Sequence, residues 1–292
     1  MNEYLPSWND GATKSAILKF VREVTEPGDG FVPVAARIAT FDNDCTLWCE
    51  KPMYIQADFI FRRLAEMVAA DPAQGEEQPW KAVVENDRAW LAGLMGHVPE
   101  LMKAVTQAYV GITTEAFEKH VAAFFESAQH PTLHVPYTAV SYRPMRELIQ
   151  LLEANDFQVY ICSAGGRDFV RVVSEEIYGI PRERVIGSAT TLEYRDGGLY
   201  RTAGVEQPID EGPGKPVHIW TRLGRTPLFA GGNADGDAAM LETARFSLLV
   251  HHDDATREFA YDEGAETALA EARERGWTVV SMRDDFAQVF DG

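Results

Sequence analysis

The spacing of hydrophobic residues changes from helical to strand-like within the first 41 positions of this chain. Residues 14–24 place apolar side chains such as Ile17 and Val21 at steps of three and four, which predicts a helix with one apolar face. Residues 35–41 follow a proline-containing turn and form a short, mostly apolar run. This run predicts a buried strand that ends where a pair of aspartates begins.

Helical spacing dominates residues 53–129. Apolar residues recur there at steps of three and four, and the β-branched runs typical of strands are missing from the sequence of this stretch. The pattern is carried by the segments MYIQADFIFRRLAEMVAA, KAVVENDRAWLAGLM, PELMKAVTQAYV and TEAFEKHVAAFFESA. The sequence therefore predicts a block of helices inserted after the first strand.

Strands and helices alternate in the rest of the chain. Helices are predicted over residues 143–155, 169–178, 215–224 and 238–243, and strands over residues 157–162, 227–230, 246–250 and 277–282. The run TTLEYRDGGLYRTA predicts a β-hairpin that turns at Asp196-Gly197-Gly198. Such alternation predicts an α/β fold with a doubly wound parallel sheet, in which ligands bind beyond the carboxyl ends of the strands.

The composition narrows the class of partner. Hydrophobic residues make up 46% of the 292 positions, which is typical of a globular protein with a sizeable core. The formal net charge of −18 argues against nucleic acid and against an anionic membrane surface, because both attract clustered Lys and Arg. For most of the surface, the acidity is interpreted as a source of solubility.

The cysteines and the N-terminal segment favour a cytoplasmic protein. Three cysteines, Cys45, Cys49 and Cys162, are too few for a disulfide framework, and no second CxxC or spaced histidine pair suggests zinc. The first 20 residues lack a basic region followed by an apolar run, and no stretch approaches the length of a membrane span. A cytoplasmic location is the expectation, although a chain trimmed of its leader would look the same.

Two aspartates follow the first predicted strand directly, in Asp42-Asn43-Asp44. Two carboxylates this close at a buried strand end repel each other unless a counter-charge or a shared proton is present. Mg²⁺ prefers such oxygen ligands and would leave Asp42 able to attack a phosphorus atom. Taken alone, the pair fits a helix N-cap or a turn equally well.

Three further groups follow predicted strands or turns. Ser163, which precedes Gly165 and Gly166, offers a hydroxyl and glycine-rich backbone to phosphate oxygens at a helix start. Lys215 offers a cation, and the segment from Asn233 to Asp237 offers oxygens to a metal ion. Each group taken alone could also be explained without any function. Ser163 could cap a helix, Lys215 could be a surface lysine, and the segment from Asn233 to Asp237 could be a solvated acidic loop.

Taken together and in this order, the four groups resemble the motifs of the haloacid dehalogenase superfamily, in its phosphoserine-phosphatase-like branch. The four motifs are matched by Asp42-x-Asp44-x-Thr46-Leu47, Ser163-x-Gly165-Gly166, Lys215 and Gly232-Asn233-x-x-x-Asp237. The matches span residues 36 to about 245, most of the chain.

The resemblance implies a Mg²⁺-dependent phosphatase that hydrolyses a small phosphomonoester through an aspartyl-phosphate intermediate. Asp42 would be the nucleophile, and Asp44 would protonate the leaving oxygen and then activate water. The residues implied to hold the phosphoryl oxygens are Ser163, Gly165, Gly166 and Lys215. Those implied to bind Mg²⁺ are Asp42, the main-chain carbonyl of Asp44, Asn233 and Asp237.

The resemblance also implies how the chain is divided. Residues 1–52 and 131–292 would form the haloacid-dehalogenase-like core, and residues 53–130 a helical cap domain over the active site. Glu50 lies one position from the family's substrate-selecting carboxylate and is the candidate for binding the rest of the substrate. Asp44 favours a phosphatase over a dehalogenase, because an alkoxide leaving group needs a proton and a halide does not.

Departures from the family pattern keep two other functions open. Asn233 stands where an aspartate is usual and brings no negative charge to the metal, which would suit a weakened phosphate-binding protein. A phosphotransferase or phosphomutase would use the same aspartyl-phosphate.

Cys45, beside the nucleophile, raises the hypothesis of oxidation sensitivity. The run from His251 to Asp254 has the composition of a metal cluster but lies outside the motifs. The identity of the substrate and the oligomeric state are not encoded in any of these motifs.

Overall fold

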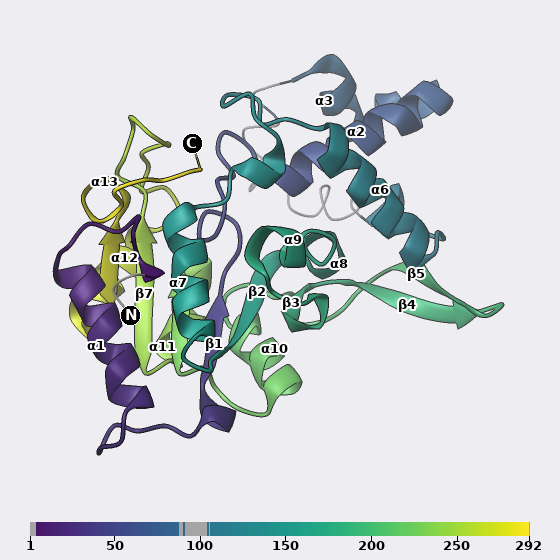
Figure 1. The fold of residues 1–292 in the computed structure, drawn as a ribbon. Coiled ribbons are helices and arrows are strands. Elements are labelled where there is room, and N and C mark those ends of the chain that lie inside the picture. The colour runs from purple at the N-terminus through teal and green to yellow at the C-terminus, as the bar shows by residue number, and fades with distance from the viewer. Residues whose placement is uncertain (1–3, 88–89, 91–103, 105, 292) are drawn as a thin grey trace. The chain divides into compact units, whose positions relative to one another are not determined.

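The computed structural model describes residues 4–87, 90, 104 and 106–291. The chain divides into two compact units, the first made of residues 1–51, 129–188 and 207–292 and the second of residues 52–128 and 189–206 (Figure 1). The predicted third helix of the insertion, over residues 99–110, and the end of the second lie mostly outside the described residues.

A six-stranded parallel sheet forms the centre of the first unit. Its strands are β1 (Ile38–Phe41), β2 (Gln158–Gly166), β3 (Val185–Ser188), β6 (Phe229–Gly232), β7 (Phe246–His251) and β8 (Thr278–Ser281). They lie in the order β3-β2-β1-β6-β7-β8, so the chain moves outward from β1 first to one side and then to the other. This is the doubly wound arrangement predicted from the alternation of strands and helices, and its switch point lies between β1 and β6.

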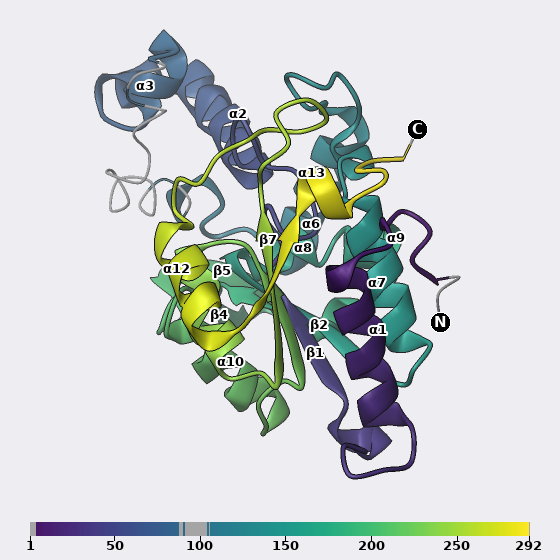
Figure 2. The same cartoon turned by 90° about the vertical axis from the view of Figure 1, so that its left-hand side faces the viewer.

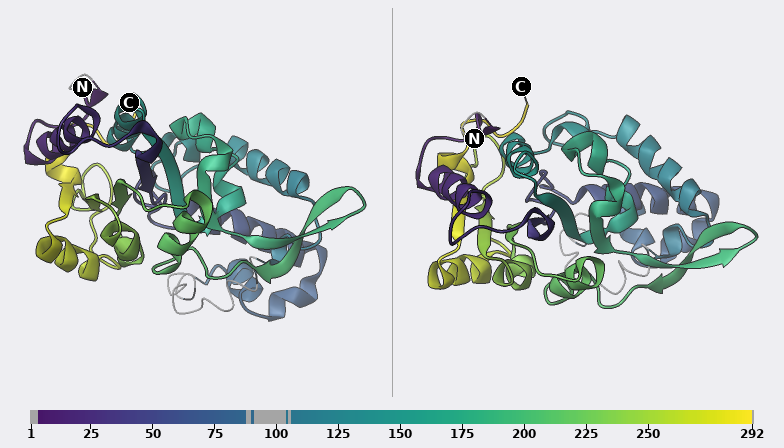
Figure 3. Two further views of the ribbon diagram at one scale, coloured as in Figure 1. Left: turned by 90° about the horizontal axis from the view of Figure 1, so that it is seen from below. Right: turned by 60° about the horizontal axis from the view of Figure 1, so that its bottom comes forward.

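Helices cover both faces of this sheet. They are α1 (Ala12–Thr25), α7 (Arg143–Glu153), α8 (Arg167–Val170), α9 (Ser174–Tyr178), α10 (Gly214–Leu223), α11 (Ala238–Glu242), α12 (Glu266–Arg275) and α13 (Met282–Asp285). Figure 2 shows α1 and α7 on one face and α10 and α12 on the other, and Figure 3 shows the same separation of α1 from α12.

Alternation along β6 explains these two layers. Phe229 points to the α1 side, where its ring centroid lies 6.1 Å from that of Phe20. Its neighbour Ala230 points the other way, into a buried cluster with Ile219 of α10, Leu241 of α11 and Ala268 of α12. Successive side chains of a strand point to opposite faces of the sheet. When both alternating sets of positions are apolar, helices must cover both faces.

The predicted elements are found with shifted ends. The first strand starts at Ile38, because residues 34–36 form a 3-10 turn. The single helix predicted over residues 169–178 was wrong, since the chain forms two short helices, α8 and α9, separated by a turn. Two β-branched residues in that turn, Val172 and Val173, disfavour a continuous helix.

The second unit combines helices with a two-stranded hairpin. Its helices are α2 (Ile55–Ala70), α3 (Trp80–Glu85) and α6 (Thr114–Ser127), and its strands are β4 (Thr190–Arg195) and β5 (Gly198–Val205). The hairpin turns at Asp196 and Gly197, both at positive φ, as the sequence predicts. The guanidinium of Arg201 lies 3.8 Å from the ring centre of Phe117, which ties the hairpin to α6. No helix among the described residues is long and apolar enough to span a membrane.

Candidate active site

The loop after β1 brings both predicted aspartates to the carboxyl edge of the sheet. The carbonyl of Asn43 accepts hydrogen bonds from the main-chain N–H groups of Leu47 (2.8 Å) and Thr46 (3.2 Å), which closes the loop over residues 42–48. No helix starts within this loop, so neither aspartate is a helix N-cap. Of the two purely structural roles considered for this pair, a helix N-cap and a turn, only the turn remains.

A buried lysine joins two of the predicted motifs to Asp42. Lys215 Nζ donates to Asp42 Oδ1 (2.5 Å), to Asp237 Oδ1 (2.7 Å) and to the main-chain carbonyl of Cys162 (2.9 Å). Lys215 is only 1% exposed, which excludes the alternative that it is an ordinary surface lysine. A buried ammonium shared by two carboxylates offsets charges that would otherwise repel each other. These contacts unite three of the four motifs around one cation.

The ionisation of this cluster follows from its burial. Burial raises the pKa of Asp42, Asp237 raises it further, and Lys215 opposes both effects. Burial alone would lower the pKa of Lys215, but Asp237 and Asp42 outweigh it and the net direction is upward. The lysine therefore stays charged, and a second cation near Asp42 would favour its nucleophilic, ionised form.

Asp44 is set apart from Asp42 by its surroundings. Its Oδ1 accepts a hydrogen bond of 2.5 Å from the indole N–H of Trp48, four residues further along the loop. Burial raises the pKa of Asp44 despite this bond and the charge of Lys215. A carboxyl group that holds its proton to higher pH is suited to act as a general acid.

The loop after β6 presents Asn233 and Asp237 to the same edge. Asp237 Oδ2 accepts from the N–H groups of Asn233 (2.8 Å) and Ala234 (3.1 Å). Gly232 permits this approach, because a Cβ at that position would lie 2.5 Å from the Cβ of Asp237. The side-chain oxygen of Asn233 accepts from the hydroxyl of Thr46 at 2.8 Å. The first and fourth motifs are thus hydrogen-bonded to each other.

The donors around Asp42 suit a hard cation. Asn233 Oδ1 is an amide oxygen with two lone pairs, and only one hydrogen bond, from Thr46, reaches it among the described residues. No group of three or more His, Cys, Asp or Glu side chains placed to hold a metal occurs in that part of the chain. The residues present nevertheless offer oxygen ligands, which fit Mg²⁺.

Ser163 lies inside β2 and does not begin a helix, which corrects the expectation for the second motif. The strand continues to Gly166, and its pairing with β3 shifts register between Ser163 and Gly166. Ser163 is fully buried, and its hydroxyl oxygen accepts from the N–H of Gly165 at 3.1 Å. The residue before it, Cys162, supplies the carbonyl bound by Lys215, so the lysine lies beside this strand end.

Glu50 is buried near the two aspartates. Its side chain is 6% exposed, and its Oε2 has no hydrogen-bond partner among the described residues. Burial raises the pKa of Glu50, and the charges of Asp44 and Asp42 add to the effect. An unsatisfied buried carboxyl oxygen is costly, which makes Glu50 a candidate for contact with a bound molecule.

Two further hypotheses from the sequence lose support. Cys45 is buried, and burial raises the pKa of its thiol, so little reactive thiolate is present to be oxidised. The side chains of the run His251 to Asp254 are mostly engaged by residues outside the run, although His251 Nδ1 also lies 3.9 Å from Asp253 Oδ2. His251 contacts Asp262, and Asp254 contacts Arg257. Among the described residues these groups do not form a metal cluster.

Asp210 was missed by the sequence analysis. It precedes Lys215 by five positions and is fully buried, and its carboxylate accepts from the thiol of Cys162 at 3.4 Å. Its own N–H donates to the hydroxyl of Ser188 at 3.1 Å. No signal in the sequence distinguished this acidic residue from the exposed ones. It ties the loop before Lys215 to the strand that carries Ser163.

Asp210 should give the protein a measurable pH dependence. Burial raises its pKa to about 6 from the usual 3.8, against the opposing charges of Lys215 and His218. Ionisation of Asp210 therefore destabilises the folded protein. This effect is absent at pH values below the pKa of Asp210 in the unfolded chain and fully present at pH values above its pKa in the folded protein. Relative to wild type, Asp210→Asn should gain on the order of 3 kcal/mol in unfolding free energy between about pH 4 and pH 7.

Urea denaturation at a series of pH values measures this gain. Asp196→Asn, in the exposed hairpin turn, serves as the control and should follow the wild-type curve. An Asp210→Asn curve parallel to wild type at every pH would show that no buried charge is present at this position.

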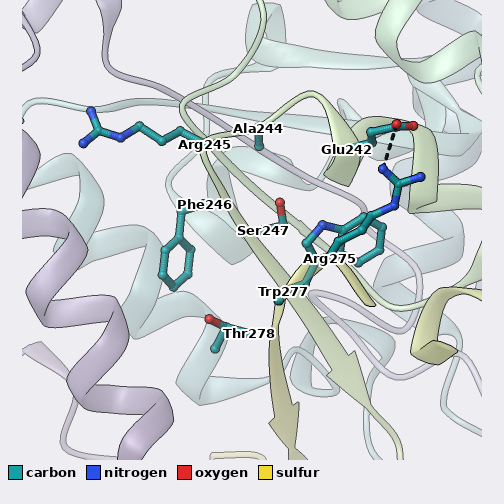
Figure 4. A pocket seen from close by; sticks show the side chains of 9 residues that line it. Glu242, Ala244, Arg245, Phe246, Ser247, Arg275, Trp277 and Thr278 are labelled. Carbon is teal, nitrogen blue, oxygen red and sulfur yellow. Dashed lines mark hydrogen bonds and ion pairs between the residues drawn. The ribbon is translucent and has the colours of Figure 1, made fainter. Parts of the chain in front are cut away.

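A surface pocket lies away from these residues. Its volume is about 330 Å³, and it is lined by the starts of β7 and β8, including Phe246, Ser247 and Thr278 (Figure 4). Strands of this parallel sheet carry the motif residues at their other ends. The Arg275 side chain in the pocket is paired with Glu242 at 2.9 Å, so it is not an open anion site. The pocket is therefore not the candidate active site.

Comparisons with known proteins identify the family of the chain. The family model of the haloacid dehalogenase-like hydrolases matches residues 39–242, whereas no curated protein sequence matches the chain.

Solved structures with similar folds are distant in sequence. A conserved protein of unknown function from Anaerococcus prevotii DSM 20548 is 16% identical, with a TM-score of 0.62 over 96% of this chain and 94% of its own. A protein of unknown function from Bordetella pertussis Tohama I is 16% identical, with a TM-score of 0.54 over 84% and 97% of the two chains. These likenesses support the fold alone. Since the family model spans most of the chain, this protein belongs to the haloacid dehalogenase-like hydrolases.

Proposed function

We propose that this hydrolase is a Mg²⁺-dependent phosphatase that cleaves a small phosphomonoester through an aspartyl-phosphate on Asp42. The observation that carries the proposal is a second carboxyl group, the half-buried Asp44, two residues beyond a carboxylate held by a buried lysine. A phosphate ester needs both a nucleophile and an acid for its leaving oxygen, and this pair supplies them.

The chain's own groups account for each step. Asp42 attacks the phosphorus atom while Asp44 gives its proton to the departing oxygen. Asp44 then takes a proton from water, which attacks the phosphorus, releases phosphate and restores Asp42. Ser163, the backbone of Gly165 and Gly166, and Lys215 hold the phosphoryl oxygens as charge moves among them.

Mg²⁺ would be held by Asp42, the main-chain carbonyl of Asp44, Asn233 and Asp237. Bound there, it would offset the negative charge of both the carboxylates and the phosphate. Asn233 brings no charge of its own, so the carboxylates of Asp42 and Asp237 would carry the electrostatic part of this affinity.

Glu50 supports a class of substrate. Its buried oxygen without a partner favours a phosphomonoester whose remaining part carries an ammonium or another hydrogen-bond donor. The assignment of residues 53–130 as a cap domain stays a prediction. So does the cytoplasmic location.

Phosphate release from a panel of small phosphomonoesters, with and without Mg²⁺, tests the function. The panel pairs aminated esters with matched esters that lack the amine, and includes p-nitrophenyl phosphate. We expect release that EDTA stops and Mg²⁺ restores. Release only in the presence of an acceptor alcohol would indicate a phosphotransferase. If neither wild type nor Asn233→Asp releases phosphate from any ester, the protein is not a phosphatase, and a phosphate-binding role is favoured.

A further inference from the structure

The backbone immediately after Asp44 is strained. Cys45 has a φ of 59°, in the left-handed region that side chains other than glycine rarely adopt. This conformation costs roughly 1–2 kcal/mol for a residue with a Cβ. It persists only where surrounding contacts hold it, and such strain is concentrated at functional sites.

Three contacts converge on this one residue. The N–H of Cys45 donates to the carbonyl of Trp48 at 2.8 Å, and the Tyr261 hydroxyl donates to its sulfur at 2.5 Å. The third contact joins Nε2 of His252 to the carbonyl oxygen of Cys45 at 2.8 Å. His252 follows β7 and is 3% exposed, so this contact is shielded from water. A carbonyl only accepts, which means that Nε2 carries a hydrogen and donates it.

The other ring nitrogen of His252 is held by a carboxylate. Nδ1 lies 3.2 Å from Oε2 of Glu258, whose two oxygens also accept from the Tyr142 hydroxyl (2.8 Å) and the Phe259 N–H (2.7 Å). Burial raises the pKa of Glu258, but the hydrogen bond and charge of His252 outweigh it and the net direction is downward. Glu258 is therefore an ionised acceptor that fixes the orientation of the imidazole.

The ring face of His252 is packed as well. Tyr261 stacks on it with ring centroids 4.6 Å apart, and the N–H of Tyr261 donates to the His252 carbonyl at 2.9 Å. Tyr142, which binds Glu258, also donates its N–H to the carbonyl of Leu47 in the catalytic loop. The whole network therefore closes on residues 42–48.

We propose that His252, oriented by Glu258, is a positioning residue that holds the strained turn at Cys45 and thereby fixes Asp44 for proton transfer. The inference rests on the proposed phosphatase function, since Asp44 is the acid in that reaction. It gives the His251–Asp254 run a role as support for the catalytic loop in place of metal binding. A shift of about 1 Å in a catalytic group is enough to lower a rate substantially.

Two amide substitutions separate the two hydrogen bonds of the ring. In His252→Gln the amide nitrogen takes the place of Nε2 and still donates to Cys45, whereas in His252→Asn it takes the place of Nδ1 and reaches only Glu258. Both variants lose one bond of the buried network, so their stability in urea should fall by similar amounts. We expect kcat to stay within about threefold of wild type in His252→Gln and to fall at least about tenfold in His252→Asn, with KM little changed in both.

Hydrogen–deuterium exchange of the peptide covering residues 42–48, measured without substrate, provides a readout independent of activity. Exchange should rise in His252→Asn and stay near wild type in His252→Gln. Equal kcat and equal exchange in the two variants, whether high or low, would overturn the inference. An inactive wild type would instead contradict the proposed function, and the exchange comparison would still decide the role of His252.

Cys45→Gly supplies a second test of how His252 acts. Glycine adopts a positive φ without strain, so the turn then depends less on the histidine. Adding His252→Asn to Cys45→Gly should raise loop exchange less than adding it to wild type. The same rise in both backgrounds would show that His252 does not act by holding the strained turn.

Discussion

Replacing Asp42 with Asn should lower phosphate release by at least about 10⁴-fold, because the amide cannot form the aspartyl-phosphate. The fold should survive this change. Lys215 keeps its contacts with Asp237 and with the carbonyl of Cys162, and the amide oxygen of the new side chain can still accept from it. Steady-state release of phosphate and the melting temperature measure the two effects.

A trapped intermediate makes the assignment more specific. Acid quenching of wild type during turnover, followed by mass spectrometry, should place one phosphoryl group on the peptide that contains Asp42. Asp44→Asn serves as the matched control, because it keeps the nucleophile and removes the acid. It should slow turnover yet still form the phosphoenzyme from an ester with a good leaving group. Retained turnover in Asp42→Asn would refute the nucleophile assignment.

Replacing Lys215 with Met should destabilise the protein by about 3–5 kcal/mol at neutral pH. The lysine is buried between Asp42 and Asp237, and its loss leaves two carboxylates without their shared cation. Activity should be lost as well, because the same ammonium is proposed to hold the phosphoryl oxygens. Urea denaturation measures the stability, and Lys19→Met on the exposed side of α1 serves as the control.

The destabilisation of Lys215→Met should depend on pH with a defined sign. Lys215 opposes the effects that raise the pKa of Asp42, so its removal raises that pKa further. A carboxyl group with a raised folded pKa destabilises the protein as pH rises above the unfolded pKa, and this effect disappears as pH falls. The deficit should therefore shrink in acid, and adding Asp237→Asn should reduce it at neutral pH. A deficit that stays constant with pH would mean that lost packing, and not unpaired charge, causes it.

The sequence was sufficient to predict the convergence of the motifs. Lys215 lies 173 positions from Asp42, yet their contact could be expected. The carboxyl ends of parallel strands share one edge of a sheet, so polar residues that follow several strands meet there. The same rule placed Asn233 and Asp237 correctly at this edge. Ser163 was assigned to a helix start, because strand propensity alone does not show that β2 continues to Gly166.

Supporting residues could not be predicted in this way. Asp210 and His252 act through contacts with Cys162 and Cys45, and neither contact follows from the position of a residue in a strand or helix. In the sequence, the run that contains His252 showed only the composition of a metal cluster outside the motifs, because composition does not reveal which way side chains point. The break between α8 and α9 was missed for a related reason, since apolar periodicity continues across it.

By itself, the sequence determined the doubly wound sheet and the order of its motifs, and it predicted which groups would react. These depend on local periodicity and on the residue types that follow each strand. Only the tertiary structure decided that Lys215 is a buried cation shared by two carboxylates, and that the loop of Asp42 and Asp44 is held by a strained turn under His252. The physical reason is that burial and charge pairing arise from distances between remote segments, and those distances set the pKa values on which the proposed chemistry depends.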